Sequence, residues 1–259
     1  MKKKLLIAAL ISSSSTVAFA QSAFEGFYGQ IATGYENNQV SNLNTVGRES
    51  NPANGGNTTL TASNQSFGGA PLVLGLGYNA SLTKDWVLGV GVDYSALSFT
   101  SSTYSYALSG PGAPGGVPGS SLTGNSLKTS QRFNVFVTPG YAIDKDKLAY
   151  LKLGYSSVQV GATPGNNVYV PSYGNFNIKS EGSGFSNQSA TVGGYVLGLG
   201  YKQMISSGFY AYGEANYYSY SKPSFTSTNV YKDGSGTLNV TSNPSVSSYQ
   251  LLVGVGYKF

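Results

Sequence analysis

The chain has 259 residues, of which only 10% are charged, and it contains 35 glycines and 21 tyrosines but no cysteine and no histidine. The absence of cysteine excludes disulfides and thiolate chemistry. The formal net charge is +5, but three of the lysines lie in residues 2–4. The rest of the chain has 12 basic against 10 acidic residues, a balance that argues against nucleic-acid binding.

The first twenty residues follow the order of a secretory signal peptide. Three lysines come first, residues 5–11 are apolar, and Ala18 and Ala20 form a small-residue cleavage site. Seven apolar residues are far fewer than the ~20 that a membrane-spanning helix needs. We therefore predict cleavage after Ala20, with residues 1–20 as the signal peptide and residues 21–259 as one exported domain.

A short motif recurs along the exported domain. Its copies are 74–78 (LGLGY), 197–201 (LGLGY) and 253–257 (VGVGY), with a weaker copy at 138–141. The first, weaker and second copies precede the short polar segments 81–85, 144–147 and 206–208. Each repeat is typical of one hairpin, in which a long loop leads into a strand that ends in Gly-Tyr and is followed by a tight turn.

This spacing predicts eight strands, because an even number of antiparallel strands can close a sheet without leaving an edge. In chain order they are 26–37, 69–80, 86–97, 129–143, 148–160, 190–203, 208–220 and 247–259. Four long segments connect them: 38–68, 98–128, 161–189 and 221–246.

Two of the long segments contain hairpin patterns of their own. Thr226–Tyr231 and Thr237–Thr241 flank an Asp-Gly turn, and Val168–Val170 could pair with Phe176–Ile178. We interpret both as hairpins that continue the eight-stranded sheet past the ends of its strands, and not as additional strands within it. A ten-stranded sheet is the alternative, although these segments contain few apolar residues. The low-complexity segment 111–119 is expected to be mobile.

The C-terminal segment alternates strictly. Apolar or aromatic residues occupy every second position back from the terminus: Tyr249, Leu251, Val253, Val255, Tyr257 and Phe259. Period two places this set on one face of a strand and the intervening residues on the other. One face suits lipid and the other suits a lumen.

A last strand of this kind, ending in Phe, is the assembly signal of bacterial outer-membrane barrels, and residues 24–259 resemble the small OmpA/OmpX-like barrel proteins. The resemblance implies an all-β fold: an eight-stranded antiparallel transmembrane β-barrel in the cell outer membrane, with short periplasmic turns and long extracellular loops. It also implies a monomer that is folded by the barrel-assembly machinery and surrounded by outer-membrane lipid and lipopolysaccharide. A soluble all-β sandwich is the alternative that composition alone leaves open.

The predicted register places outward aromatic residues at two heights, as in the girdles of such barrels. The periplasmic set is Phe27, Tyr78, Trp86, Tyr141, Tyr201, Phe209, Tyr257 and Phe259, and the outer set is Tyr35, Tyr94, Phe133, Tyr155, Tyr195, Tyr217 and Tyr249. Between them we expect the outward residues Leu72, Leu74, Leu88, Val90, Val135, Val137, Leu151, Leu153, Leu197 and Val253.

The same register places charged residues inside the barrel. Glu36, Asp93 and Arg132 are expected high in the lumen, and Lys152 and Glu214 near mid-height; Lys202 and Lys258 also face inward. Mixed charges at matched heights can pair into a plug, whereas a selectivity filter or proton path is the alternative. Inward glycines suit a narrow barrel: Gly75, Gly77, Gly89, Gly91, Gly198, Gly200, Gly254 and Gly256.

The plug favours a structural protein whose loops serve adhesion, host contact or phage attachment. A small porin, or an OmpW-like route for hydrophobic molecules, is the alternative. Some outer-membrane barrels are enzymes, namely lipid A acylases and deacylases, a phospholipase and surface proteases, and those that we can compare use a catalytic histidine. This chain has no histidine, so we expect no enzyme activity. We also expect no cofactor, metal or nucleic acid.

Overall fold

The computed structural model describes residues 22–51, 56–111, 116–172 and 174–259. The predicted signal peptide and part of the predicted mobile segment, residues 112–115, lie outside these ranges. The described residues form seventeen strands and one helical turn, α1 (Ile178–Glu181). Within them, no helix has the length and hydrophobicity needed to cross a membrane.

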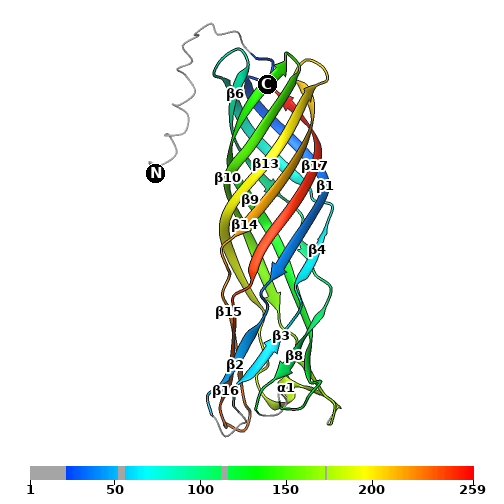
Figure 1. The fold of residues 1–259 in the computed structure, drawn as a ribbon, viewed down its shortest axis with the longest axis vertical. Coiled ribbons are helices and arrows are strands. Elements are labelled where there is room, and N and C mark those ends of the chain that lie inside the picture. Colours follow the sequence, from blue (N-terminus) through cyan, green and yellow to red (C-terminus); the bar gives the residue numbers. More distant parts are fainter. Residues whose placement is uncertain (1–21, 52–55, 112–115, 173) are drawn as a thin grey trace, which may run out of the picture.

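Eight strands pair side by side in a closed antiparallel ring (Figure 1). The order around the ring is β1–β5–β6–β9–β10–β13–β14–β17 and back to β1. The bounds are β1 (Gly26–Ser41), β5 (Val73–Ser81), β6 (Trp86–Ser95), β9 (Ser121–Asp144), β10 (Lys147–Thr163), β13 (Gln188–Met204), β14 (Phe209–Tyr220) and β17 (Ser245–Lys258). Each predicted strand corresponds to one ring strand, and β9 is longer than predicted by eight residues at its N-terminal end.

One predicted strand boundary is wrong. The stretch 69–80 is interrupted: Gly69 ends β4 (Gln65–Gly69), and β5 begins only at Val73. Pro71 lies in the gap, where its missing N–H cannot donate to a sheet ladder. Leu72 therefore precedes the ring strand and is half-buried, so it does not belong to the outward apolar set.

Short turns join the ring strands at the end where both termini of the described chain lie (Figure 1). In the turn between β9 and β10, the Asp144 carboxylate accepts a hydrogen bond from the Asp146 amide at 2.8 Å. In the turn between β13 and β14, Gly208 has a φ of 81°, which a residue with a side chain adopts only at a cost. The predicted short turns are therefore built from residues suited to them.

The outer face of the ring is apolar between two aromatic belts. At the short-turn end, cross-strand pairs pack edge to face, with ring centroids of Phe27 and Tyr78 4.8 Å apart and those of Trp86 and Tyr141 5.4 Å apart. At the other end, the Tyr217 and Tyr249 centroids are 5.1 Å apart. Every predicted belt residue is exposed except Tyr217, which its neighbours half-bury, and Leu88 between the belts is also half-buried.

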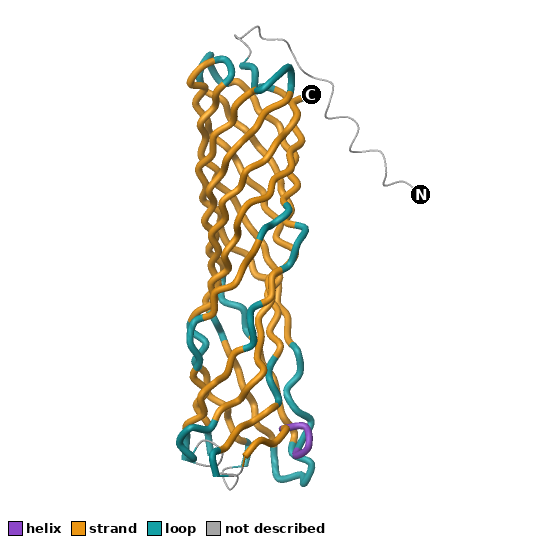
Figure 2. Tube along the Cα trace, turned by 90° about the vertical axis from the view of Figure 1, so that its right-hand side faces the viewer, coloured by secondary structure: helices purple, strands orange, loops and turns teal. Residues whose placement is uncertain are grey.

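The four long segments build a second ring at the end of the first ring that is opposite the short turns, which is the lower end in Figure 2. Its strands pair in the order β15–β16–β2–β3–β8–β9–β11–β12. Their bounds are β2 (Thr45–Glu49), β3 (Thr58–Thr61), β8 (Tyr104–Ser109), β11 (Asn167–Val170), β12 (Gly174–Asn177), β15 (Phe225–Val230) and β16 (Thr237–Ser242). We call this structure the upper ring and the closed ring of eight strands the lower ring; in Figures 1 and 2 the upper ring is drawn at the bottom.

Residues 181–184 complete the upper ring after α1. Gly182 forms a β-bridge with Tyr231, the Ser183 amide donates to the Val230 carbonyl at 2.9 Å, and the Lys232 amide donates to the Glu181 carbonyl at 3.0 Å. These bonds join the segment after β12 to β15. Both predicted hairpins are present, and both belong to the upper ring rather than to the lower one, so the ten-stranded alternative is wrong.

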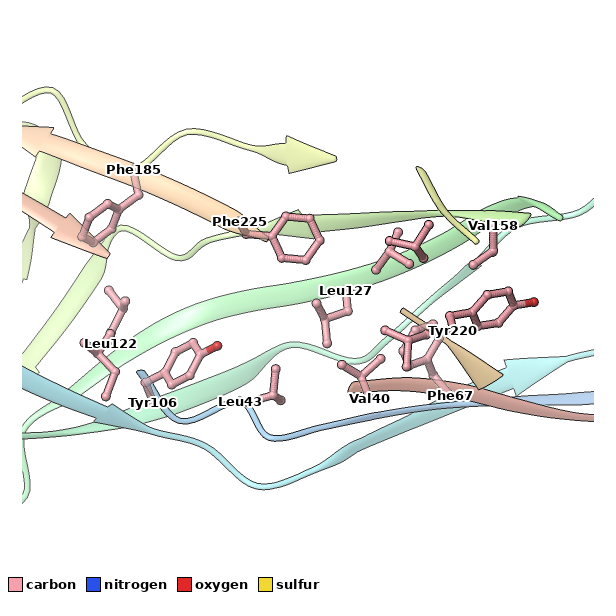
Figure 3. Close-up of a cluster of buried hydrophobic side chains, with 14 of the residues drawn as sticks. Val40, Leu43, Phe67, Tyr106, Leu122, Leu127, Val158, Phe185, Tyr220 and Phe225 are labelled. Atoms are coloured by element: carbon pink, nitrogen blue, oxygen red, sulfur yellow. The ribbon is translucent and has the colours of Figure 1, made fainter. Parts of the chain in front are cut away.

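The largest apolar core lies inside the upper ring and the adjoining part of the lower ring (Figure 3). It extends from Phe185 and Leu122 through Leu43 and Leu127 to Tyr220, which lies above the charged lumen. Two short strands form part of the wall where the rings meet: β4 pairs with β1, and β7 (Phe99–Thr100) pairs with β9. The long segments are thus an ordered part of the fold.

Candidate functional site

The lower charged cluster in the lumen has Lys152 at its centre. The Lys152 ammonium lies 2.6 Å from an Asp93 oxygen and 2.9 Å from a Glu214 oxygen, and all three side chains are almost fully buried. Glu214 also accepts hydrogen bonds from the Tyr150 hydroxyl at 2.8 Å and from the Asn216 amide at 2.7 Å. Asp93 accepts one from Asn134.

The upper charged cluster has Arg132 at its centre. Its guanidinium lies 2.5 Å from a Glu36 oxygen and donates to the Tyr220 hydroxyl at 2.9 Å, while Asn38 and Ser248 accept from it at 3.0 Å each. The guanidinium carbon also lies 4.5 Å from the centre of the Tyr218 ring. Five partners from three strands, β1, β14 and β17, therefore hold this one cation in place.

Two amide side chains connect the clusters. The Asn216 amide donates both to Glu214 and, at 3.3 Å, to the Gln250 oxygen. The Gln250 amide in turn donates to Glu36 at 2.9 Å. A continuous polar network therefore runs from Asp93 to Arg132 across the lumen.

Asp93 belongs to a different cluster from the one expected. The sequence places Asp93 high, with Glu36 and Arg132, but its carboxylate pairs with Lys152 in the lower cluster. Strand stagger accounts for the difference, since position along a strand does not give height directly once tilted strands close into a ring. The pair between Lys152 and Glu214 matches the expected arrangement.

The other two inward lysines are not in the network. Lys202 is buried below the lower cluster, with its ammonium 4.3 Å from the centre of the Tyr28 ring and about 5 Å from those of Tyr150 and Tyr210. This is a cation–π arrangement, and no carboxylate of the described chain lies within ion-pair distance of Lys202. Lys258 is half-buried at the short-turn end.

Large tyrosines fill the lumen around the charges, and the inward glycines make room for them. A Cβ atom at Gly200 would collide with the Tyr150 ring, one at Gly256 with Tyr210, and one at Gly77 with Tyr28. The glycines are predictable from the sequence as small residues, but their pairing with tyrosines is not. A signal for the tyrosines exists, because Tyr210, Tyr212, Tyr218 and Tyr220 share the inward parity of Glu214.

The predicted assembly residues line the outer face of β17, a strand that is paired on both sides, with β1 and β14. Tyr249, Leu251, Val253, Val255, Tyr257 and Phe259 are all exposed on the outer face. The Phe259 amide donates to the Phe27 carbonyl at 2.9 Å, and its ring packs against Tyr257 at 5.2 Å. The C-terminal residue is thus joined by its backbone to the first ring strand, while its side chain stays largely exposed.

The lumen is therefore a filled interior in which charges of both signs neutralise one another. Three acids and three bases are buried there, namely Glu36, Asp93, Glu214, Arg132, Lys152 and Lys202. Among the described residues, no group of three or more His, Cys, Asp or Glu side chains could hold a metal ion. The arrangement can rigidify the ring, because the three buried acids are paired with Lys152 and Arg132.

Comparisons with known proteins agree with this architecture. The family model for the outer membrane protein beta-barrel domain matches residues 6–259. No curated protein matches the chain. The family assignment therefore rests on the match that covers nearly the whole sequence.

Several solved structures are similar in outline. The attachment invasion locus protein Ail of Yersinia pestis is 14% identical, with 91% of this chain and 99% of that chain covered and a TM-score of 0.38. OprG of Pseudomonas aeruginosa is 14% identical over 91% and 97%, with a TM-score of 0.45. The outer membrane protease OmpT of Escherichia coli is 12% identical over 95% and 100%, also with a TM-score of 0.45.

Proposed function

Because the chain belongs to the outer membrane protein beta-barrel domain family, we propose that its lower ring is an eight-stranded transmembrane barrel with a structural and surface-interaction role. The protein resides in the outer membrane. In this proposal the short turns face the periplasm, and the upper ring stands outside the cell, because barrels of this class have short periplasmic turns and long extracellular loops.

The filled lumen carries the proposal. An eight-stranded barrel is just wide enough for its own side chains. Here two linked ion-pair clusters and the surrounding tyrosines occupy that space, with Lys152 and Arg132 each bound to buried carboxylates. Moving an ion through would require breaking buried pairs, which is costly. The small-porin alternative has no comparable support.

The upper ring supplies the surface for interaction. Its outer face combines threonine and asparagine side chains with exposed apolar residues, including Val46, Tyr169 and Val230. Rigid β-structure that carries polar and aromatic side chains suits contact with a protein or glycan surface of a host cell or phage. Outer-membrane lipid, lipopolysaccharide and the barrel-assembly machinery are the other partners in this proposal, and the barrel acts as a monomer.

We further propose that the protein is not an enzyme. The whole sequence lacks histidine, which removes the usual general acid or base of neutral pH. The buried carboxylates at the lumen are already committed to Lys152 and Arg132, so none is free to activate a nucleophile.

Conductance across a planar bilayer tests the filled lumen. The refolded protein should insert without producing discrete current steps, while a known porin reconstituted in the same lipid serves as the positive control. Reproducible steps from the wild-type protein would replace the structural role with a channel.

Removal of one hairpin tests the surface role. Deleting 225–242 takes β15 and β16 out of the upper ring, whereas replacing only 232–236 with Asn-Gly shortens the tip. Both variants should keep a heat-modifiable lower ring. Binding to host cells or matrix should be lost in the first variant and kept in the second. Binding that survives the full deletion would exclude the upper ring as the contact surface.

A further inference from the structure

The upper ring is hollow. Two adjoining cavities of about 70 Å³ and 220 Å³ lie within it, and they share Leu60, Leu122, Phe185 and Val240 as walls. Protein interiors are close-packed, with few voids larger than a water molecule. A chamber of this size in an otherwise packed apolar core therefore calls for an explanation.

The larger cavity has a mostly apolar lining, with polar residues at Glu49, Thr58, Glu181, Asn229 and Tyr231. Glu49, at the end of β2, and Tyr231, just after β15, both line it. The Tyr231 hydroxyl donates to one Glu49 carboxylate oxygen at 2.5 Å. Burial and this hydrogen bond raise the pKa of Tyr231, so its hydroxyl keeps the proton that it donates.

The second Glu49 oxygen is buried, and no donor in the described chain bonds to it. A buried acceptor without a donor costs free energy. Asn229 also lines the cavity, but within the described chain its amide nitrogen donates no hydrogen bond to Glu49, and its oxygen accepts from the Gly184 amide at 2.8 Å. A ligand that brings one N–H or O–H donor would satisfy the Glu49 oxygen.

The volume limits the size of such a ligand. A dry apolar cavity of roughly 150 Å³ is large enough to bind benzene, and the larger cavity here exceeds that. We propose that the upper ring binds a small, mostly apolar molecule with a single hydroxyl or ammonium group, and that Glu49 accepts a hydrogen bond from that group.

The chamber is separate from the charged lumen of the lower ring. Leu43, Leu127 and Phe225 line the smaller cavity on the side toward the membrane. Val40, Phe67 and Tyr220 follow before the Arg132 cluster (Figure 3). The apolar layer lies between the chamber and the charged network, so the inference goes beyond the proposed function and holds for a barrel that does not conduct.

The test compares two probes of the same shape, p-cresol and p-xylene, which differ by a hydroxyl in place of a methyl. Methyl NMR of the full barrel in lipid nanodiscs should show saturable shifts at Leu60 and Ile178 with both probes. Glu49→Leu should weaken p-cresol about tenfold, the usual worth of a hydrogen bond to a charged group, and leave p-xylene unchanged.

A second variant separates the contribution of the cavity space from that of the Glu49 hydrogen bond. Leu60→Phe fills the space that the two cavities share and should weaken both probes. Val46→Phe adds the same bulk on the exposed outer face of β2 and should change neither. Absence of saturable shifts in the wild-type protein would overturn the proposal. So would equal loss of both probes in Glu49→Leu, or unchanged binding in a folded Leu60→Phe variant.

Discussion

Lys152 on β10 and Glu214 on β14 are separated by the whole of β13, yet their charged groups lie 2.9 Å apart. They meet because β13 presents Gly198 directly opposite Lys152, and a glycine has no side chain to stand between them. Asp93 reaches the same ammonium from β6 on the opposite side of Lys152. One cation thus connects three strands that are not neighbours, and we call this connection across the lumen the Lys152 cross-link, an ion-paired and not a covalent one.

We expect Lys152→Met to be the most damaging substitution in the lumen. It leaves two buried carboxylates without a cation, and breaking a buried pair costs about 3–5 kcal/mol. Glu214→Gln should cost less, because Lys152 keeps Asp93. Urea unfolding in lipid vesicles, followed by heat modifiability, measures both. Lys145→Met, at a turn where the side chain is 88% exposed, is the control. Equal stability of Lys152→Met and the control would contradict a stabilising role for the Lys152 cross-link.

We expect Gly200→Ala to destabilise the ring by about 1–3 kcal/mol, because the added methyl collides with the Tyr150 ring. Gly213→Ala, on the neighbouring strand, is the matched control, since its Cβ would meet only the Leu252 carbonyl at 3.8 Å. Thermal unfolding of both variants tests the difference. If the Gly200→Ala penalty persists in a Tyr150→Leu background, the collision is not its cause.

Trp86 gives a direct measure of where the membrane lies. It is the only tryptophan in the sequence, and its side chain is exposed in the belt at the short-turn end. Lipids brominated near the headgroup should quench its fluorescence more than lipids brominated near the chain ends. A Trp86→Phe/Val90→Trp variant, with the indole between the belts, should show the reverse order. The same order in both proteins would mean that the belts do not mark the membrane surfaces.

We expect deletion of Phe259 to impair assembly in cells more than stability in vitro. Its side chain is 76% exposed and contributes little packing, so the refolded variant should unfold almost like the wild type. In cells, the family likeness predicts less heat-modifiable protein in the outer membrane. Phe209→Ala removes another exposed aromatic of the same belt and should assemble normally. Normal assembly without Phe259 would argue against a terminal signal.

Strand positions and facing are predictable from this sequence because lipid imposes a strict rule. Nearly all outward residues between the belts are apolar, so period two is visible at Val253 and Val255 and fixes the parity of each whole strand. Parity is enough to place Lys152 and Glu214 inside. It does not give relative height across tilted strands, and for this reason Asp93 was expected in the wrong cluster.

The upper ring shows the opposite case. Its strands are short, and their pairing partners come from different long segments, as when β2 pairs with β16. Local patterns predict hairpins such as β15 with β16, whose partners are adjacent in the chain. They do not predict that residues 181–184 return to β15. Nor do they predict the chamber, since Glu49 and Tyr231 are 182 positions apart.

The length of β9 determines how far the protein reaches. Twelve residues separate Phe133, in the upper aromatic belt, from Ser121 at the start of the strand. At about 3.3 Å per residue, and allowing for strand tilt, the wall rises roughly 30 Å beyond the belt. That exceeds the height of the apolar band itself, about 25 Å. A partner that touches the tip would therefore be held away from the lipid headgroups by rigid β-structure and not by a flexible linker. The length of that structure would fix the distance between the partner and the membrane.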